Sequence, residues 1–275
     1  GVFMLTVLII LLVLAALYLL TLQGRRNHPL WKTFRHQRFC HRGYHDKPVI
    51  PENSLPAFRR AIERGFGAEL DVHLLKDGTL AVFHDSDLRR CANVEGEIED
   101  LTLDELKQLR LEGTDEQIPT FDEVLALFEH ETPLIIELKT ARGNHMALAK
   151  AVCERLDSYQ GEFCIESFDP FCVLDVKKLR PEICRGQLSM NFCKDPSSLP
   201  FYKRVIAGNM LLNFLTRPDF IAYKFEDRKG LSSALCRTLW GIQEVSWTIR
   251  QKEDLLEAEQ AGSIGIFECF DPDEP

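Results

Sequence analysis

The chain has 275 residues, of which 45% are hydrophobic and 27% are charged, and its net charge is −9. This length suits one large α/β domain or two small ones, and the composition excludes a disordered, collagen-like or coiled-coil protein. Residues 1–40 carry five arginines and lysines and no acidic residue, so the rest of the chain is strongly acidic. An acidic body attracts nucleic acid poorly, so no nucleic-acid partner is expected.

Residues 2–22 form an apolar run without a charge. At about 1.5 Å per residue this run spans about 30 Å, the thickness of the hydrocarbon core of a bilayer. It predicts a retained transmembrane anchor over residues 1–22. The alternative, a signal peptide, requires a basic start, a shorter apolar core and a small-x-small exit, and none of these is evident.

Residues 23–38 are interpreted as a basic linker that follows the anchor. Because the nearby positive charge lies after the apolar run, the charge bias predicts a single-pass membrane protein whose body is cytoplasmic, with anionic lipid headgroups beside the basic segment. The nine cysteines include no CxxC pair, which favours reduced thiols in a reducing compartment.

From residue 39 to residue 275, strand and helix signals alternate, which predicts an α/β fold of the (β/α)₈ TIM-barrel type. The expected strands are 39–42, 67–73, 80–84, 133–138, 162–166, 184–188, 220–224, 244–248 and 264–268. The expected helices include 54–65, 144–157, 170–180, 231–241 and 251–261. Two more helices are expected to begin at capping boxes, at Thr102 and at Thr120.

Nine strands are one too many for the barrel. The run Lys76-Asp77-Gly78-Thr79 contains an Asp-Gly pair, which is typical of a two-residue hairpin turn. The strand 80–84 is therefore predicted to be an extra antiparallel strand beside 67–73. Pairing about a two-residue turn would place Asp71 opposite His84.

Carboxylates follow the expected strand period. Glu69 and Asp71 share one face of a strand, and Glu137 and Lys139 share a face of another. The carboxyl ends of barrel strands meet at one mouth, where three carboxylates suit a hard divalent cation such as Mg²⁺ or Ca²⁺. The alternative interpretation is a set of ion pairs at the rim.

Two histidines end expected strands. His41 precedes Arg42 and Gly43, a pair that suits phosphate binding, and His84 ends the hairpin strand. Near a metal, the two imidazoles would act as general base and general acid. The alternative is a structural role, which is the interpretation kept for His28, His36, His45, His130 and His145. His73, on the face of Asp71, is at most an indirect participant.

Through its motifs taken together, the chain resembles the glycerophosphodiester phosphodiesterase family over most of residues 39–272. The order and spacing of the motifs are more specific than any one of them. They are His41-Arg42-Gly43, Pro51-Glu52-Asn53-Ser54, Ala57-Phe58, Glu69-Leu70-Asp71-Val72, Lys76-Asp77-Gly78, His84-Asp85, Ile118-Pro119-Thr120, Ile136-Glu137-Leu138-Lys139, Ser167-Phe168-Asp169 and Val245-Ser246-Trp247-Thr248.

The resemblance implies a TIM barrel with one divalent cation and a role for each matching residue. Metal ligands would be Glu69, Asp71 and Glu137, catalytic histidines His41 and His84, phosphate contacts Arg42 and Lys139, and residues near the substrate Glu52, Asn53 and Trp247. Trp247 has core packing as an equal alternative. The chain departs from the family pattern at Thr248-Ile249-Arg250 and Phe270-Asp271-Pro272, which affects only the expected detail of the substrate pocket.

The expected reaction is the metal-dependent hydrolysis of a glycerophosphodiester to sn-glycerol 3-phosphate and an alcohol. A carboxylate beside an imidazole raises its pKa, so His84 opposite Asp71 would be the acid. Alternatives are a lysophospholipase D that forms lysophosphatidic acid from membrane lysophospholipids, a lyase that forms a cyclic phosphate, and a non-catalytic binder. Residues 205–215 are apolar and would either line the mouth or form a buried helix.

Overall fold

The computed structural model describes residues 1–194 and 199–274. Eight parallel strands form a closed barrel, because β1 pairs with β9 on one side and with β2 on the other, in the order β1-β9-β8-β7-β6-β5-β4-β2. The strands are β1 Phe39–Cys40, β2 Gly67–Leu74, β3 Leu80–Val82, β4 Leu134–Leu138, β5 Phe163–Ser167, β6 Arg185–Ser189, β7 Phe220–Lys224, β8 Gln243–Ile249 and β9 Ile264–Phe267. The predicted TIM barrel with an extra strand is confirmed.

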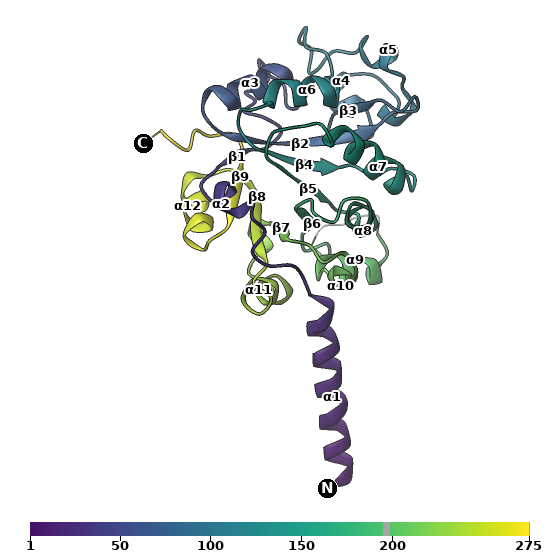
Figure 1. Cartoon of the computed structure of the whole chain (residues 1–275), viewed down its shortest axis with the longest axis vertical. Helices are drawn as coiled ribbons and strands as arrows, with labels where there is room; N and C mark the ends of the chain where they lie inside the picture. The colour runs from purple at the N-terminus through teal and green to yellow at the C-terminus, as the bar shows by residue number, and fades with distance from the viewer. Residues whose placement is uncertain (195–198, 275) are drawn as a thin grey trace.

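Most of the helices lie around the outside of the barrel, while α1 projects away from it (Figure 1). The helices are α1 Val2–Thr21, α2 Trp31–Phe34, α3 Leu55–Glu63, α4 Arg89–Ala92, α5 Leu103–Leu106, α6 Phe121–Phe128, α7 His145–Leu156, α8 Pro170–Leu179, α9 Phe201–Gly208, α10 Asn213–Thr216, α11 Leu231–Thr238 and α12 Lys252–Gln260, with 3-10 turns at Ile98–Asp100 and Phe225–Asp227. Both predicted capping boxes are present: the Thr102 and Thr120 hydroxyls each accept from the backbone N–H three residues later.

The hairpin between β2 and β3 differs from the prediction by one residue. Val72 pairs with Val82, and the Leu75 N–H donates to the Thr79 carbonyl, so the loop has three residues and not two. Its last residue, Gly78, has φ +89°, as in a turn that ends in a left-handed residue. The prediction that Asp71 faces His84 is therefore wrong, because the extra loop residue shifts the register and brings Phe83 opposite Asp71.

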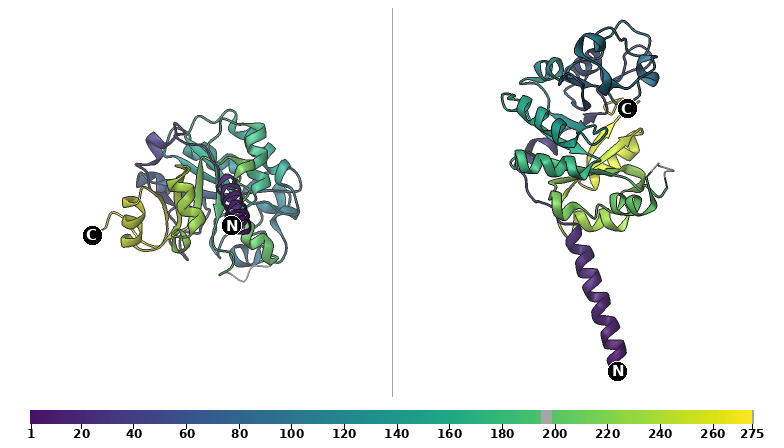
Figure 2. Two further views of the ribbon diagram at one scale, coloured as in Figure 1. Left: turned by 90° about the horizontal axis from the view of Figure 1, so that it is seen from below. Right: turned by 90° about the vertical axis from the view of Figure 1, so that its right-hand side faces the viewer.

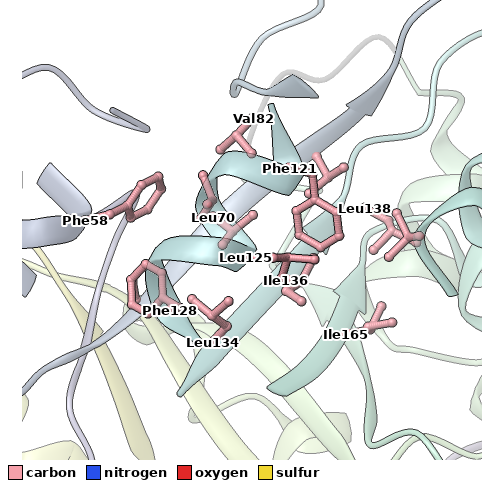
Figure 3. Packing of buried hydrophobic residues seen from close by; sticks show 14 of the residues in the cluster. Phe58, Leu70, Val82, Phe121, Leu125, Phe128, Leu134, Ile136, Leu138 and Ile165 are labelled. Carbon is pink, nitrogen blue, oxygen red and sulfur yellow. The ribbon is translucent and has the colours of Figure 1, made fainter. Parts of the chain in front are cut away.

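Apolar side chains of the surrounding helices pack against the outer face of the barrel strands. Figure 3 shows Phe58 of α3 and Phe121, Leu125 and Phe128 of α6 packed over the outward side chains of β2 and β4, among them Leu70. All of these are nearly or fully buried. The outer faces of β2 and β4 are thus fixed by aromatic packing, while their inner faces remain for other side chains.

The N-terminal ends of the strands are closed by the segment before β1. Trp31 and Phe34 of α2 are buried and form one cluster with Phe39 of β1 and Phe220 of β7. The ring centroids of Trp31 and Phe220 are 5.7 Å apart, and those of Phe34 and Phe39 are 5.1 Å apart. Residues 23–38, expected as a linker, are therefore packed against the barrel.

Helix α1 projects away from the barrel with its apolar side chains exposed (Figures 1 and 2). It is long and apolar enough to cross a membrane, a property it shares with signal sequences near an N-terminus. Its last turn contacts α11 and the residues that follow α11: the Tyr18 hydroxyl lies 2.7 Å from Ser232 Oγ of α11, and the indole N–H of Trp240 donates to the Leu19 carbonyl. Leu22, directly after α1, is completely buried.

Candidate active site

Three carboxylates converge inside the barrel at the C-terminal ends of β2 and β4. Asp71 and Glu137 are register partners on these neighbouring parallel strands, and Glu69 lies two residues before Asp71 on the same face. One oxygen from each of the three lies within 4.8 Å of the others, and all three side chains are buried. Asp71 Oδ1 accepts no hydrogen bond. We call these three residues the carboxylate cluster; its oxygen donors fit a hard divalent cation.

Crowding of like charges changes the protonation of the carboxylate cluster. Burial, together with the charges of Asp71 and Glu137, raises the pKa of Glu69 well above its usual value. Burial also opposes ionisation of Asp71, but Lys139, His84 and Arg42 outweigh it and lower the pKa of Asp71. Three ionised carboxylates this close are unfavourable without a cation, so the site favours either a metal or a retained proton.

The Nδ1 atom of each predicted catalytic histidine is hydrogen-bonded to a carboxylate. His41 Nδ1 lies 2.5 Å from Glu268 Oε2, and its Nε2 lies 4.0 Å from Glu69 Oε2. Burial lowers the pKa of His41 to about 4, although the hydrogen bond to Glu268 acts in the opposite direction. His84 Nδ1 is hydrogen-bonded to Asp85 Oδ1. In both histidines Nδ1 is engaged, so Nε2 is the nitrogen left for proton transfer.

The loop after β1 bends Arg42 into the carboxylate cluster. Arg42 has φ +57° and Gly43 has φ +79°. A Cβ on Gly43 would lie 2.9 Å from the Cβ of Ala57, so only glycine fits there. The backbone N–H of Arg42 donates to Glu69 Oε2, and its guanidinium Nε lies 3.6 Å from Asp71 Oδ2.

Glu52 and Asn53 support this loop from its other side. Glu52 Oε1 accepts hydrogen bonds from the guanidinium groups of Arg42 and Arg90, while Glu52 Oε2 pairs with Lys47. The Asn53 amide donates to Asp71 Oδ2 at 2.8 Å. Both carboxylate oxygens of Glu52 therefore pair with basic side chains, and Glu52 fixes the position of the Arg42 guanidinium.

Lys139 lies beside the carboxylate cluster and lines a cavity above it. Its Nζ lies 2.9 Å from Glu137 Oε1 and 3.3 Å from Asp71 Oδ1. The cavity has a volume of about 240 Å³, and we call it the catalytic hollow. It is lined by His73, His84, Ser86, Glu137, Leu138, Lys139, Thr140, Ser167, Phe168 and Asp169.

Trp247 and His73 stand outside the group that touches the carboxylate cluster. The Trp247 ring packs edge-on against Phe168 with centroids 5.6 Å apart, and its indole N–H donates to the Ala222 carbonyl. Trp247 thus supports a wall residue of the catalytic hollow. His73 Nδ1 lies 2.7 Å from Glu99 Oε1 and its Nε2 lies 3.0 Å from the His84 carbonyl oxygen, so it fixes the loop that carries His84.

The sequence-based predictions gave no site role to three acidic residues near the site. Glu268, directly after β9, contacts His41 and also lies 3.6 Å from Nε2 of His45, which was expected to be only structural. Asp85 joins His84 to Arg90. Glu166 of β5 is the register partner of Glu137, and burial together with Glu137 and Asp71 raises its pKa. Glu166 and Glu268 lie at the C-terminal ends of strands, and this position was the sequence signal that could have identified them as site residues.

Comparison with known proteins gives one consistent family. The model of the glycerophosphoryl diester phosphodiesterase family matches residues 41–268. A glycerophosphodiester phosphodiesterase of Caldanaerobacter subterraneus subsp. tengcongensis is 31% identical over 248 residues, which cover 83% of this chain and 91% of the relative. A lysophospholipase D of Rattus norvegicus is 32% identical over 142 residues, which cover 47% of this chain and 43% of the relative.

Solved structures share the same fold. A glycerophosphodiester phosphodiesterase of Thermotoga maritima is similar with a TM-score of 0.65 and 27% identity, over 85% of this chain and 94% of the other. A phosphodiesterase of Oleispira antarctica, solved with the product sn-glycerol-3-phosphate, is similar with a TM-score of 0.68 and 25% identity, over 84% and 92% of the two chains. The family match, the similar sequences and the shared barrel together show that this chain belongs to the glycerophosphoryl diester phosphodiesterase family, a family of enzymes.

Proposed function

We propose that the chain hydrolyses glycerophosphodiesters to sn-glycerol 3-phosphate and an alcohol, with one divalent cation, Mg²⁺ or Ca²⁺, held by Glu69, Asp71 and Glu137. The observation that carries this proposal is the carboxylate cluster, whose oxygens lie within 4.8 Å of one another beside two basic side chains and two histidines. When bound, a divalent cation there would neutralise charge on the phosphodiester and orient it.

The basic side chains act on the phosphate. Arg42 and Lys139 provide positive charge at the edge of the carboxylate cluster, where the diester anion would bind. Their charge also stabilises the extra negative charge that develops on phosphorus-bound oxygens in the transition state. Glu52 and Asn53 act near the substrate by orienting Arg42 and Asp71, and Trp247 acts through Phe168.

The two histidines divide the proton transfers. The low pKa of His41 keeps its imidazole neutral near pH 7, which suits acceptance of a proton from the attacking hydroxyl at Nε2. His84 then donates a proton to the leaving alcohol, with Asp85 in place of the Asp71 contact expected from the sequence. The attacking group is either water or a hydroxyl of the substrate itself.

We also propose that α1 is a retained membrane anchor, with the catalytic body on the cytoplasmic side. The support is the packing of its last turn, because removal of residues 1–22 as a leader would delete the buried Leu22 and the Tyr18 contact to Ser232. Protease protection in sealed vesicles tests this orientation. Digestion of the barrel from the side opposite the cytoplasm would contradict it, and release of the intact barrel by alkaline carbonate would contradict a spanning helix.

A second candidate is lysophospholipase D activity, which cleaves the same bond in a membrane lysophospholipid. It is favoured by the similarity to a rat lysophospholipase D and by the presence of an apolar helix that would hold the enzyme at its substrate. A lyase would instead release a cyclic phosphate as its final product.

The decisive experiment incubates the full chain in detergent with glycerophosphocholine, after chelation and after addition of Mg²⁺ or Ca²⁺, with products identified by mass. We expect sn-glycerol 3-phosphate and choline only with a cation, and equal activity in the control variant Glu129→Gln, whose side chain is exposed and remote. Full activity in the chelator would contradict the metal, and a cyclic phosphate as the end product would favour the lyase.

A further inference from the structure

An apolar groove lies beside the catalytic hollow, between α8 and α9. Its volume is about 530 Å³, within the range of small-molecule sites. The side chains that form its apolar lining come mainly from the ends of β5 and β6 and from α9. They include Phe168, Phe171, Phe192, Tyr202, Ile206 and Met210.

The groove adjoins the catalytic hollow. Phe168 and Asp169 line both of them, so one molecule could occupy the two spaces together. The Phe168 ring also stacks edge-on against Phe192, with centroids 6.1 Å apart, and against Trp247. Phe168 thus forms the shared wall of the two spaces, with Phe192 beside it in the groove and Trp247 supporting it from behind.

One lining residue of the groove belongs to the apolar cluster that holds the chain directly after α1. Met210 lines the groove and belongs to the same apolar cluster as Leu22, the buried residue that follows α1. Figure 1 shows α9 and α10 next to the point where α1 leaves the barrel. A lipid beside α1 would therefore lie close to the helices that border the groove.

Large apolar side chains are exposed on the helices around this point. Phe201 and Tyr202 of α9, Phe214 of α10 and Leu231 of α11 are all at least 42% exposed. Aromatic and aliphatic side chains of this kind favour the boundary between water and lipid. Helix α9, which lines the groove, thus also presents part of the surface that would face a bilayer.

We infer that this groove binds the single acyl chain of a lysophospholipid while its phosphodiester occupies the catalytic hollow; the inference rests on the proposed phosphodiesterase function. Water attacks phosphorus, the bond from phosphorus to the head-group alcohol breaks, and a new P–O bond forms. His41 takes a proton from the water and His84 gives one to the alcohol. The products are lysophosphatidic acid and the free alcohol, and the acyl ester is unchanged.

One acyl chain fits the observations better than two. The groove is one cavity that adjoins the catalytic hollow at Phe168 and Asp169, and its lining residues on α9 are apolar except for Lys203. Each methylene moved from water into such a groove contributes about 0.8 kcal/mol, so up to about fourfold in kcat/KM. The dependence of turnover on chain length is therefore a direct readout.

The test compares lysophosphatidylcholines of increasing acyl length, held below micelle formation, with glycerophosphocholine, which has no acyl chain. In the full chain we expect kcat/KM to rise with each methylene until the groove is full. Ile206→Glu, which places a charge in the groove, should flatten this rise and leave glycerophosphocholine turnover unchanged. Val205→Glu, on the same helix but outside the lining residues, is the matched control and should keep the rise.

A second variant controls for misfolding of the first variant. A binding measurement tests the groove even if the protein does not cleave the substrate. Ala207→Phe should fill the groove without a charge and shorten the preferred chain. Binding of tetradecylphosphocholine, followed by calorimetry, should weaken at least tenfold in Ile206→Glu and not in Val205→Glu.

Two results separate the hypotheses. If the wild type cleaves glycerophosphocholine but shows no dependence on chain length, or if both glutamate variants bind the alkyl probe equally, the groove inference is overturned and the phosphodiesterase proposal stands. If the wild type binds the probe through Ile206 but cleaves no phosphodiester with either cation, the proposed function fails and the groove stands as a lipid site.

Discussion

The two ends of the barrel use the same strands in opposite ways. At the N-terminal ends, Trp31, Phe34 and Phe220 fill the opening with aromatic rings. At the C-terminal ends, Glu69 and Asp71 bring buried negative charge into the barrel. The first arrangement stabilises the fold at once, whereas the second favours it only when protons, basic side chains or a cation balance the charge.

This contrast separates residues that stabilise the barrel from residues expected to act in the reaction. Substitutions at the aromatic end should change the free energy of unfolding and spare turnover, and substitutions in the carboxylate cluster should do the reverse. Proteins commonly accept such local instability at functional sites. Four experiments test whether the division holds in this chain.

The largest effect is expected for Glu69→Gln. Without a cation the raised pKa of Glu69 favours its protonated form, which glutamine resembles, so the free energy of unfolding in chelator should change little. With a cation, kcat/KM should fall by about 10⁴-fold, or roughly 5.5 kcal/mol, because one ligand and its charge are lost. Steady-state kinetics and urea unfolding measure the two quantities. An active Glu69→Gln enzyme would remove Glu69 from the metal site.

The opposite pattern is expected for Phe34→Ala at the aromatic end. Removal of a completely buried phenyl ring should lower the free energy of unfolding by about 3–5 kcal/mol. Turnover of the folded fraction should remain within about twofold of the wild type, since α2 lies at the other end of the strands. Urea titration with activity measured at each concentration reports both. A selective loss of turnover without loss of stability would break the division between the ends.

The stability of the folded chain should depend on pH through His41. Its pKa of about 4 lies below the usual value near 6.5, so between these pH values the unfolded chain binds a proton that the folded chain does not. Stability should therefore fall as the pH drops, by about 2 kcal/mol between pH 7 and about pH 5 from this group. Urea unfolding in chelator at the two pH values should show this loss in the wild type and not in His41→Asn. Equal losses in both proteins would contradict it.

The smallest effect is expected for Glu166→Gln, which tests the edge of the carboxylate cluster. Glu166 is buried beside Glu137, and its raised pKa favours a neutral side chain. Glutamine should therefore change kcat/KM by less than about threefold. Comparison of its cation dependence with that of the wild type is the measurement. A loss as large as that of Glu69→Gln would make Glu166 a fourth ligand.

The sequence allowed much of this architecture to be predicted, because local signals there agree with the fold. Strand runs such as 220–224 and the capping boxes at Thr102 and Thr120 are properties of short segments. The convergence of Glu69, Asp71 and Glu137 followed from strand period and the barrel rule, although their roles remain to be tested. What was missed depends on geometry that a motif does not carry.

Three examples show the limit. One extra loop residue at Gly78 changed the partner of Asp71, because register depends on the turn type and not on the Asp-Gly pair alone. Glu268 meets His41 only when the barrel closes β9 onto β1. The segment 23–38 looked like a linker because its charges dominate its composition, while two aromatic side chains, of Trp31 and Phe34, do the packing.

The aromatic closure of the barrel has a practical consequence for any shortened form of this enzyme. The family match begins at residue 41, after Trp31, Phe34 and Phe39. A version trimmed to the matched residues would expose Phe220 and its neighbours as a sticky apolar opening, and such surfaces lead to self-association. A water-soluble variant should keep residues 23–40 and replace Leu22, not delete the segment that closes the barrel.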